Sequence, residues 1–559
     1  MPSFIHDGFY FVIVISIVVI IHEFGHFLLA RLCGVRVEAF SLFFGRAILK
    51  WKRGDTEWRL GVIPIGGYVK MLGQSDMDAV ETENIDEDVR EVSFAHKPLW
   101  AKALIVAAGP ASNLLLAFVI FSLLFFAGYP TPTTLLGSVD KDGAAWAAGI
   151  RPGDRIVAID GKEVWRWDDM AEIIGDNPET PMTFSVERGQ DRLETSVTPR
   201  MSRIKNIFQF DADAGVIGVS LDGYLPIAGV SDPTGSAAVA GLRTGDLIKK
   251  VSGVEIHYFS DVERVLSGSE GPIEFEIERG GLVLDEQKRD PQEMSFVLTS
   301  PVPVNTSADI GLERADLYVH QVVEDNPAQM AGLLNGDRLF KINGQVLKDW
   351  RAFTEWARSN PGKELSISVL REGREMSFAL TPKPVMEKNM LGEEEEIGRV
   401  GVYPWLSFSM PEIKKEKYLN PVKAFSRGMD TSVKWTVLTI KGFFYLFTGD
   451  VSVKTLGGPI MIANLAGKSA SGGYFSFFMF VAIISLNLAI INFLPIPVLD
   501  GGHLMIFGIE GIIRRPISAT GMQFVMKIGL FIVGILVVAT FYNDISRLVF
   551  PGLRSLFGL

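Results

Sequence analysis

Four apolar runs, each about as long as a helix that crosses a bilayer, constrain the fold of this chain most strongly. The runs are about Phe9–Ala30, Leu104–Gly128, Tyr474–Leu494 and Met522–Tyr542. They are set among ordinary globular stretches, and the mean hydropathy of the 559 residues is therefore only +0.24. Because lipid offers no hydrogen-bond partners to the backbone, each run is expected to be an α-helix. We predict a polytopic α-helical membrane protein with about four transmembrane helices.

Basic residues lie in the connections that follow the first and the third run. The first connection holds Arg31, Arg36, Arg46, Lys50, Lys52 and Arg53, and the second holds Arg514 and Arg515. Since short loops rich in Lys and Arg stay in the cytoplasm, both termini and the long middle segment are predicted to lie outside. No Lys or Arg precedes the first run and no small-residue cleavage site ends it, so we expect a retained helix rather than a signal peptide.

The five residues His22-Glu23-Phe24-Gly25-His26 lie inside the first run, near its cytoplasmic end. Positions i and i+4 share one face of a helix, so the two imidazoles can bind one Zn²⁺ while Glu23 accepts a proton from water beside it. The alternative is that the pair only forms hydrogen bonds inside a helical bundle. Ionisable groups are costly in a bilayer, and two His with a Glu are hard to satisfy structurally, so the motif favours a metal site.

The composition limits both the class of binding partner and the side chains that could bind a metal. A net charge of −11 argues against nucleic acid as the main partner. Cys33 is the only cysteine, which excludes an intramolecular disulfide framework and a multi-cysteine zinc site. A metal would therefore use His and carboxylate ligands.

A third metal ligand is expected just after the third run. Pro495 and Pro497 end that helix, because proline lacks a backbone donor and crowds the preceding turn. Non-helical backbone at membrane depth is tolerated only against protein or a water-filled cavity. Either Asp500 or His503 can turn back toward the first run from this break.

The long segment between the second and third runs contains three copies of one pattern. Gly149, Gly241 and Gly332 each begin a stretch that ends in Gly-Asp, and they are 92 and 91 residues apart. About ninety residues are enough for a small core. The pattern resembles PDZ domains of the bacterial type, which are α+β modules whose groove can bind an extended peptide or a peptide C-terminus. The alternative is that the modules only fill space around the active site.

A short Gly-containing stretch follows each copy. The stretches are Ile217-Gly218-Val219, Ile310-Gly311-Leu312 and Val400-Gly401-Val402. Each is a candidate carboxylate-binding loop or edge strand, of either the preceding or the following module. Farther along, Val433–Phe447 is too short to span and carries Lys434 and Lys441 on one helical face, which predicts a helix at the outer interface. A re-entrant segment is the alternative.

Together these motifs resemble the site-2 protease family of intramembrane metalloproteases. The resemblance rests on the His-Glu-x-x-His motif and on the Asn-x-x-Pro-x-Pro-x-Leu-Asp-Gly run. It extends to Gly109-Pro110-Ala111-Ser112-Asn113, Gly458-Pro459-Ile460 and Ile65-Gly66-Gly67-Tyr68-Val69-Lys70-Met71, and so covers nearly the whole chain. Similar bacterial members have two PDZ modules, whereas this chain has three, so details of substrate gating do not carry over.

The resemblance implies a role for each matched residue. His22, His26 and Asp500 would hold Zn²⁺, and Glu23 would be the general base and then the general acid. The substrate would be bound near the metal by Asn487, Asn492, Pro495 and Pro497. A two-strand element around Trp58–Leu72 would form a membrane-associated β-loop that Gly66 and Gly67 keep free of side chains.

We therefore expect a zinc-dependent endopeptidase of the bacterial inner (cytoplasmic) membrane, with extracytoplasmic PDZ modules and an active site near the cytoplasmic side. By the resemblance, its substrates would be single-pass membrane proteins already trimmed outside, such as an anti-sigma factor of a stress response, or signal-peptide remnants. The competing expectation is a membrane-anchored PDZ scaffold with a non-catalytic metal site, which would need a fourth protein ligand. The predicted domains are residues 1–128 (two spans and β-loop), 129–205, 206–303 and 304–405 (three modules), 406–472 (amphipathic helix) and 473–559 (two spans).

Overall fold

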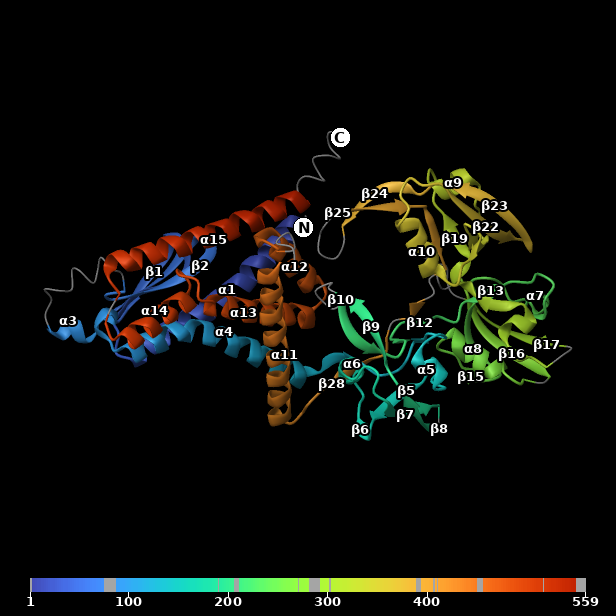
Figure 1. Cartoon of the computed structure of the whole chain (residues 1–559), viewed down its shortest axis with the longest axis horizontal. Helices are drawn as coiled ribbons and strands as arrows, with labels where there is room; N and C mark the ends of the chain where they lie inside the picture. Colours follow the sequence, from blue (N-terminus) through green and yellow to red (C-terminus); the bar gives the residue numbers. More distant parts are fainter. Residues whose placement is uncertain are drawn as a thin grey trace. The chain divides into compact units, whose positions relative to one another are not determined.

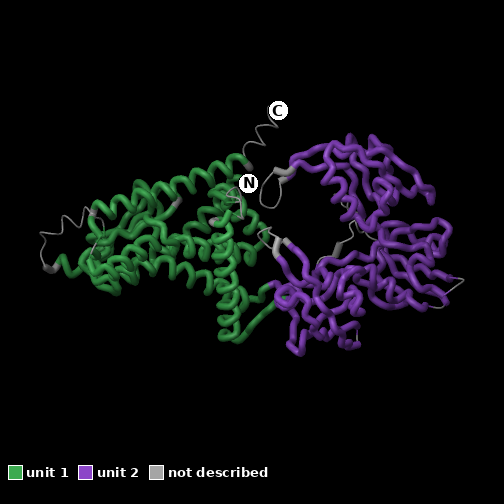
Figure 2. The backbone as a smooth tube through the Cα atoms, viewed as in Figure 1, with its two compact units in different colours: residues 1–129, 415–559 green, residues 130–414 purple. Residues whose placement is uncertain are grey.

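The computed structural model describes residues 3–74, 87–189, 191–205, 211–269, 271–280, 292–300, 303–388, 394–405, 408–409, 411–449, 456–515 and 517–548. The chain divides into two compact units, which Figure 2 colours separately. Unit 1 is Met1–Tyr129 with Lys415–Leu559, and unit 2 is Pro130–Lys414. The strands β3 (Tyr129–Pro132) and β28 (Ile413–Glu416) carry the chain from one unit to the other.

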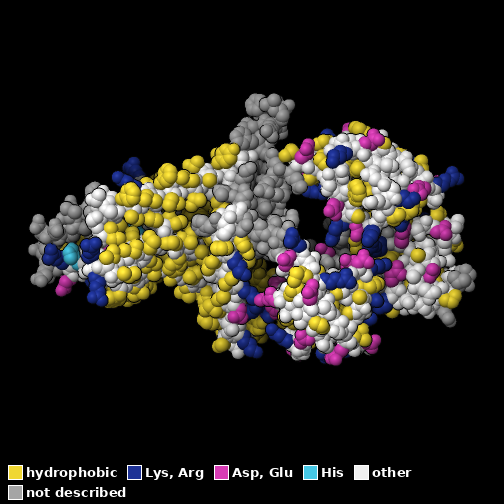
Figure 3. Space-filling view, in the orientation of Figure 1, with side chains coloured by type: hydrophobic (Ala, Val, Ile, Leu, Met, Phe, Trp, Pro, Cys, Tyr) yellow, Lys and Arg dark blue, Asp and Glu magenta, His cyan; other side chains and the backbone are white. Residues whose placement is uncertain are grey.

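Unit 1 is built around four long apolar helices, α1 (Ser3–Leu32), α4 (Leu99–Ala127), α13 (Tyr474–Phe493) and α15 (Ala519–Leu548). Among the described residues, these four helices are long and apolar enough to cross a membrane. They contain the four predicted apolar runs except for Gly128 and Leu494, which directly follow α4 and α13. Hydrophobic side chains dominate the visible surface of unit 1, whereas charged side chains are scattered over unit 2 (Figure 3). The surface of unit 1 thus suits lipid on the outside of the bundle.

The core of this bundle lies where α1, α4 and α13 meet. Val14, Phe121 and Val481, one from each helix, are 0% exposed. The other described helices of unit 1 are α3 (Glu87–Glu91), η2 (Phe94–His96), α11 (Pro421–Thr448), α12 (Pro459–Ser471) and α14 (Asp500–Ile513). Helix α4 is in direct contact with four other helices of the bundle, α1, α11, α13 and α14. This places α4 at the centre of unit 1.

Helix α11 is longer than the predicted segment Val433–Phe447. It begins at Pro421, where the Asn420 side chain accepts a hydrogen bond from the Val422 backbone and so caps the helix. In Figure 1 it lies across the direction in which α1, α4 and α13 run. That course agrees with a helix parallel to the bilayer surface, and its position at the interface stays a prediction.

The strands β1 (Val37–Arg53) and β2 (Thr56–Met71) form one sheet that bends back on itself. Phe40 pairs with Val69 on one side and with Trp58 on the other, and Trp58 pairs with Trp51. The segments therefore lie in the order 47–53, 56–63, 39–44 and 67–71. The two-strand element predicted around Trp58–Leu72 covers only half of this sheet, because the basic residues of 46–53 look like a cytoplasmic connection when the sequence alone is considered.

Unit 2 contains three four-stranded antiparallel sheets of the same topology. Their strand orders are β6-β5-β7-β8, β15-β14-β16-β17 and β21-β20-β22-β23. Ile156, Ile248 and Leu339 occupy equivalent positions on β5, β14 and β20, and each is 0% exposed within a separate core. Each repeat of the sequence is therefore a module with its own core.

The bounds of these elements are similar from copy to copy. Module 1 has α5 (Ala144–Ala147), β5 (Arg155–Ile159), β6 (Lys162–Glu163), α6 (Trp167–Asp176), β7 (Met182–Arg188) and β8 (Asp191–Val197). Module 2 has α7 (Ser236–Ala240), β14 (Leu247–Val251), β15 (Val254–Glu255), α8 (Phe259–Leu266), β16 (Pro272–Arg279) and β17 (Gln292–Thr299). Module 3 has α9 (Pro327–Ala331), β20 (Arg338–Ile342), β21 (Gln345–Val346), α10 (Trp350–Arg358), β22 (Leu365–Arg371) and β23 (Arg374–Leu380). Two hairpins, β9–β10 (Arg200–Lys205 and Asp211–Val216) and β24–β25 (Lys383–Lys388 and Glu394–Arg399), follow modules 1 and 3.

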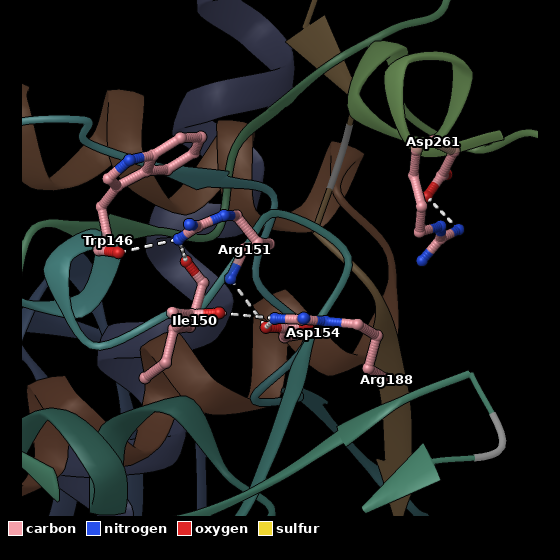
Figure 4. A network of polar contacts seen from close by, with 8 residues as sticks. Trp146, Ile150, Arg151, Asp154, Arg188 and Asp261 are labelled. Carbon is pink, nitrogen blue, oxygen red and sulfur yellow. Dashed lines mark hydrogen bonds and ion pairs between the residues drawn. The ribbon is translucent and has the colours of Figure 1, made fainter. Parts of the chain in front are cut away.

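The Gly-Asp turn of each module is closed by an arginine. In module 1, Arg188 donates two hydrogen bonds of 2.7 Å to the buried Asp154 and a third to the Gly149 carbonyl (Figure 4). The same arrangement joins Arg279 to Asp246 and Arg371 to Asp337, again at 2.7 Å. A bidentate pair of this kind orients the turn as well as neutralising the buried carboxylate.

Each Gly-containing stretch pairs with the module that precedes it. The strands β11 (Val219–Ser220), β18 (Leu312–Arg314) and β26 (Val402–Pro404) pair with β4 (Ser138–Val139), β13 (Ala228–Val230) and β19 (Val319–Val322). Ile217 and Ile310 are buried in the first and the second core. The predicted limits 206–303 and 304–405 assign these residues to the following module, and residues next to the limits at 206 and 406 lie outside those described.

Candidate metal centre

Three potential metal ligands meet between α1 and the first turn of α14. His22 Nε2 lies 3.3 Å from His26 Nε2, and Asp500 Oδ2 lies 3.2 Å from the first and 3.6 Å from the second. Both histidines are 8% exposed. The i, i+4 spacing puts the two rings on one face of α1, and Asp500 is the first residue of α14. The structure thus brings together residues that are 474 to 478 positions apart in the sequence.

The spacing of these three atoms suits a tetrahedral metal ion. Zinc bonds of about 2.0–2.1 Å in a tetrahedron put neighbouring ligand atoms roughly 3.3–3.4 Å apart. The three distances of 3.2, 3.3 and 3.6 Å bracket that value. Two imidazoles and one carboxylate are also a ligand set of catalytic zinc sites, which keep one position open. His22, His26 and Asp500 therefore fit a zinc ion.

The ring of His26 is held against α4. Its Nδ1 lies 2.9 Å from the Ile105 carbonyl, which can only accept, so Nδ1 donates and Nε2 is left to bind a metal. The two helices approach closely here, since a Cβ on Gly109 would overlap the His26 ring and one on Gly25 would overlap the Ala108 carbonyl. Small residues at such a crossing let the backbones of two membrane helices come together.

Glu23 lies beside this cluster and against the sheet. A Cβ on Gly67 would lie 3.1 Å from Glu23 Cγ and 2.9 Å from the Ser41 carbonyl oxygen, so only glycine fits at this position. The backbone N–H of Val69 is within hydrogen-bonding reach of the Glu23 carboxylate. Gly66 has a φ of +72° and no room for a Cβ against the Phe44 ring. The two glycines therefore let the sheet approach the helix that carries Glu23.

The break after α13 is a tight loop, Leu494–Leu499, between α13 and α14. It contains Pro495 and Pro497, and Val498 has a φ of +88°, a strained conformation for a β-branched residue. A Cβ on Gly501 or Gly502 would overlap carbonyls of this loop, so the loop lies directly on the first turn of α14. Strain that persists in a loop is often found at a functional site.

The two asparagines of α13 have different surroundings. Asn492 Nδ2 lies 3.5 Å from His22 Nε2, next to the cluster. The Oδ1 atom of Asn487 instead accepts a hydrogen bond of 3.0 Å from Thr439 on α11. Five residues correspond to about 140° around a helix, so the two side chains point in different directions. Asn487 is therefore not brought to the metal ligands, and His503 is also outside the ligand group formed by the described residues.

Two contacts of the site were not expected from the sequence. Ile105 supplies the carbonyl behind His26, and Asn113, which is 0% exposed, lies 3.3 Å from His22 Nδ1. Asn113 belongs to the Gly109–Asn113 motif. The motif indicated that this part of α4 is important, but it did not indicate which atom Asn113 contacts. Helix α4 therefore supports both histidines from behind.

A protein-family model and several known proteins match this chain over almost its full length. The model of Peptidase family M50 matches residues 10–536. The Protease RseP of Yersinia pestis is 31% identical over 541 residues, which are 96% of this chain and 98% of that protein. The Regulator of sigma-E protease RseP of Escherichia coli (strain K12) is 30% identical over 555 residues, 98% of this chain and 100% of that protein. A putative zinc metalloprotease of Neisseria meningitidis is 29% identical over 545 residues, 97% of this chain and 100% of that protein.

Among solved structures, the PDZ domain of an SdrC-like protein from Listeria innocua matches 16% of this chain and 92% of its own. The TM-score is 0.13 and the identity 23%. So partial a likeness carries no argument.

Proposed function

The chain belongs to peptidase family M50, the site-2 protease family, and from this membership we propose that it cleaves peptide bonds inside the transmembrane segments of single-pass membrane proteins. The relatives' names support a zinc-dependent metalloendopeptidase. The observation that carries the finer proposal is the position of His22 and His26 within a candidate membrane span, at zinc-binding distance from Asp500.

Each residue of the site has a distinct task in this reaction. His22, His26 and Asp500 would hold the ion, and zinc, when bound, would activate a water molecule and polarise the scissile carbonyl. Glu23 would take the proton from the attacking water and pass it to the leaving amine nitrogen. Asn492 lies at the cluster and would donate a hydrogen bond to the substrate backbone near the scissile bond.

A helical substrate must unwind before its carbonyl can be attacked, and its freed backbone groups then need partners in the lipid. The segment 67–71 of β2 pairs with 37–42 on one side, and no other described strand pairs with its second edge. The backbone N–H of Val69 on this segment is within hydrogen-bonding reach of the Glu23 carboxylate. A substrate strand added along this edge would therefore lie beside the general base.

A non-catalytic metal site is the weaker reading. A structural zinc site is closed by four protein ligands. Among the described residues, only His22, His26 and Asp500 form the ligand group, and His503 is not part of it. A group of three protein ligands supports the hydrolytic proposal, because it would leave one position of a tetrahedral ion for water.

The three modules of unit 2 are proposed to be PDZ modules that control admission. Their combined bulk would exclude substrates that still carry a folded outer domain, so that only trimmed proteins, such as an anti-sigma factor or a signal-peptide remnant, reach the site. Binding of a peptide C-terminus in a groove is the competing mode. We favour the filter, because linked modules always add bulk but add affinity only if their geometry allows joint engagement.

The proposed location is the bacterial inner membrane, with unit 2 outside and the site near the cytoplasmic side. The β1–β2 sheet would contact lipid, since Ile48, Leu49 and Trp51 are 62%, 58% and 55% exposed on a segment rich in Lys and Arg. In a chain without Cys33, a cysteine at the exposed Lys348 should react with an impermeant thiol reagent on intact cells. A cysteine at Arg515 should react only after lysis, and labelling in the opposite sense would reverse the topology.

The decisive experiment measures zinc content and cleavage of a single-span substrate on the same purified variants. Glu23→Gln should keep zinc and lose cleavage, whereas His22→Ala and Asp500→Ala should lose both, because they remove ligands. Glu91→Gln on the exposed face of α3 is the matched control and should change neither. Cleavage by Glu23→Gln at a rate near wild type would remove Glu23 from the mechanism.

A further inference from the structure

Asn113 on α4 is fully buried behind His22, on the side away from the metal ligands. Its side-chain Nδ2 lies 3.3 Å from His22 Nδ1, and its exposed fraction is 0%. Its Oδ1 has no hydrogen-bond partner among the described residues. Such an amide oxygen is uncommon in a protein interior and needs an explanation.

The explanation follows from which nitrogen of the imidazole ring carries the hydrogen. A histidine that binds a metal through Nε2 carries its hydrogen on Nδ1 and donates it to an acceptor. His26 meets this condition, because its Nδ1 faces the Ile105 carbonyl at 2.9 Å. His22 faces an amide group instead, and an amide offers a donor in one orientation and an acceptor in the other.

The two orientations of the amide correspond to two states of the site. With Nδ2 toward the ring, His22 Nδ1 must accept, so the ring hydrogen sits on Nε2 and points at Asp500 Oδ2, 3.2 Å away. That network closes without a metal. With Oδ1 toward the ring, Nδ1–H donates to the amide, and the Nε2 lone pair faces Asp500 and His26, where a metal would lie.

We propose that Asn113 is the positioning residue of His22, and that its Oδ1 accepts the Nδ1 hydrogen and so fixes the metal-binding tautomer of the ring. The inference rests on the proposed function only in assigning zinc to this site. The amide can turn between the two orientations, because no described group holds Oδ1 in its present place. Ser485 Oγ on α13 donates a hydrogen bond of 2.9 Å to the Asn113 backbone carbonyl, so this contact between α4 and α13 does not involve the side-chain amide that faces His22.

Three substitutions separate this role from simple packing. Asn113→Leu has a similar size but no acceptor, Asn113→Asp keeps an acceptor oxygen, and Ser485→Ala disturbs the same contact between α4 and α13 without touching His22. The dissociation constant for zinc is measured on the full-length chain in detergent, by competition with a chelator of known affinity. This readout does not depend on proteolysis.

We expect Asn113→Leu to weaken zinc binding about 10- to 100-fold, the usual effect of losing such a supporting partner. Asn113→Asp should bind within about threefold of wild type or more tightly, because a carboxylate is a stronger acceptor for the same hydrogen. Ser485→Ala should bind as wild type does. If Asn113→Leu does not fold, Asn113→Ala replaces it with the same expectation.

Two results would overturn the inference. One is unchanged zinc affinity in the apolar variants. The other is an equal loss in Asn113→Asp, which would reduce Asn113 to a packing residue. Zinc binding by wild type without any cleavage would refute the protease proposal and leave this inference standing, whereas absence of zinc binding by wild type would end both.

Discussion

The close approach of α4 to the metal site makes Gly109→Ala the most sensitive single change that the structure offers. The substitution adds one methyl group in the middle of an apolar helix, where alanine is ordinarily the better helix former. Its effect should therefore come from the contact with His26 alone. We expect a chain that folds and inserts but binds zinc poorly.

The magnitude follows from the distances. A Cβ at position 109 would overlap His26 Nε2, the metal-binding atom, and would lie 2.6 Å from Cε1 and 2.8 Å from Cδ2, whereas contacts under 3.4 Å are already tight. The ring would have to retreat by at least about 0.8 Å, several times the tolerance of about 0.2 Å for a metal–ligand distance. The retreat would also lengthen the 2.9 Å hydrogen bond to the Ile105 carbonyl. Because a ligand itself is displaced, zinc affinity should fall by more than about 100-fold, the upper range for a supporting partner, or about 2.8 kcal/mol.

Chelator competition and cleavage of a single-span substrate measure this loss together. The matched control is Gly8→Ala on α1, where a Cβ would have no atom within 4 Å. It should leave zinc binding unchanged and stabilise the helix by about 0.5–1 kcal/mol. If Gly109→Ala binds zinc within about threefold of wild type, the crossing of α1 and α4 has more slack than these distances allow, and the argument for its tightness fails.

Two further predictions concern unit 2. Arg188→Met removes the ion-pair partner of the Asp154 carboxylate, whose side chain is only 1% exposed. The free energy of unfolding of module 1, measured by pulse proteolysis in urea, should therefore fall by about 3 kcal/mol. The matched control Arg192→Met replaces an exposed arginine and should change this free energy little. Joining Tyr224 to Phe408 by an Asn-Gly turn removes modules 2 and 3, since these two residues are already antiparallel partners. If the modules act as a filter, the shortened chain should cut an untrimmed substrate that wild type leaves intact, and trimmed substrates about as before. Untrimmed substrate that stays intact with a folded, zinc-loaded variant would contradict the filter.

The part of the site that lies within one element could be predicted from the sequence. His22 and His26 are four residues apart, and the helical period alone puts their rings on one face. Pro495 and Pro497 likewise mark the end of α13, which stops at Phe493. The same period separates Asn487 and Asn492 by about 140° around the helix, so the sequence alone predicts that the two side chains have different surroundings.

The supporting contacts could not be predicted in this way. Asn113 is 91 residues from His22, and Ile105 is 79 residues from His26. Both contacts depend on where α1 and α4 cross, which is set by the packing of Gly25 against the Ala108 carbonyl and of Gly109 against the His26 ring. A helix period says which residues share a face and leaves open which face meets which.

The pairing of the closing strands in the modules could not be predicted from the sequence either. This pairing determines where modules can be deleted without damage to the one that remains. A repeat of 92 and 91 residues shows that there are three copies, but a closing strand pairs according to contacts that are distant in sequence. A deletion that began at the predicted limit of 206 would take Ile217 and β11 from module 1, although Ile217 is 2% exposed in its core. Loss of that side chain alone should cost about 2–3 kcal/mol. A deletion between Tyr224 and Phe408 keeps the closing strand, so a loss of filtering there can be assigned to the missing modules rather than to damage in the one that remains.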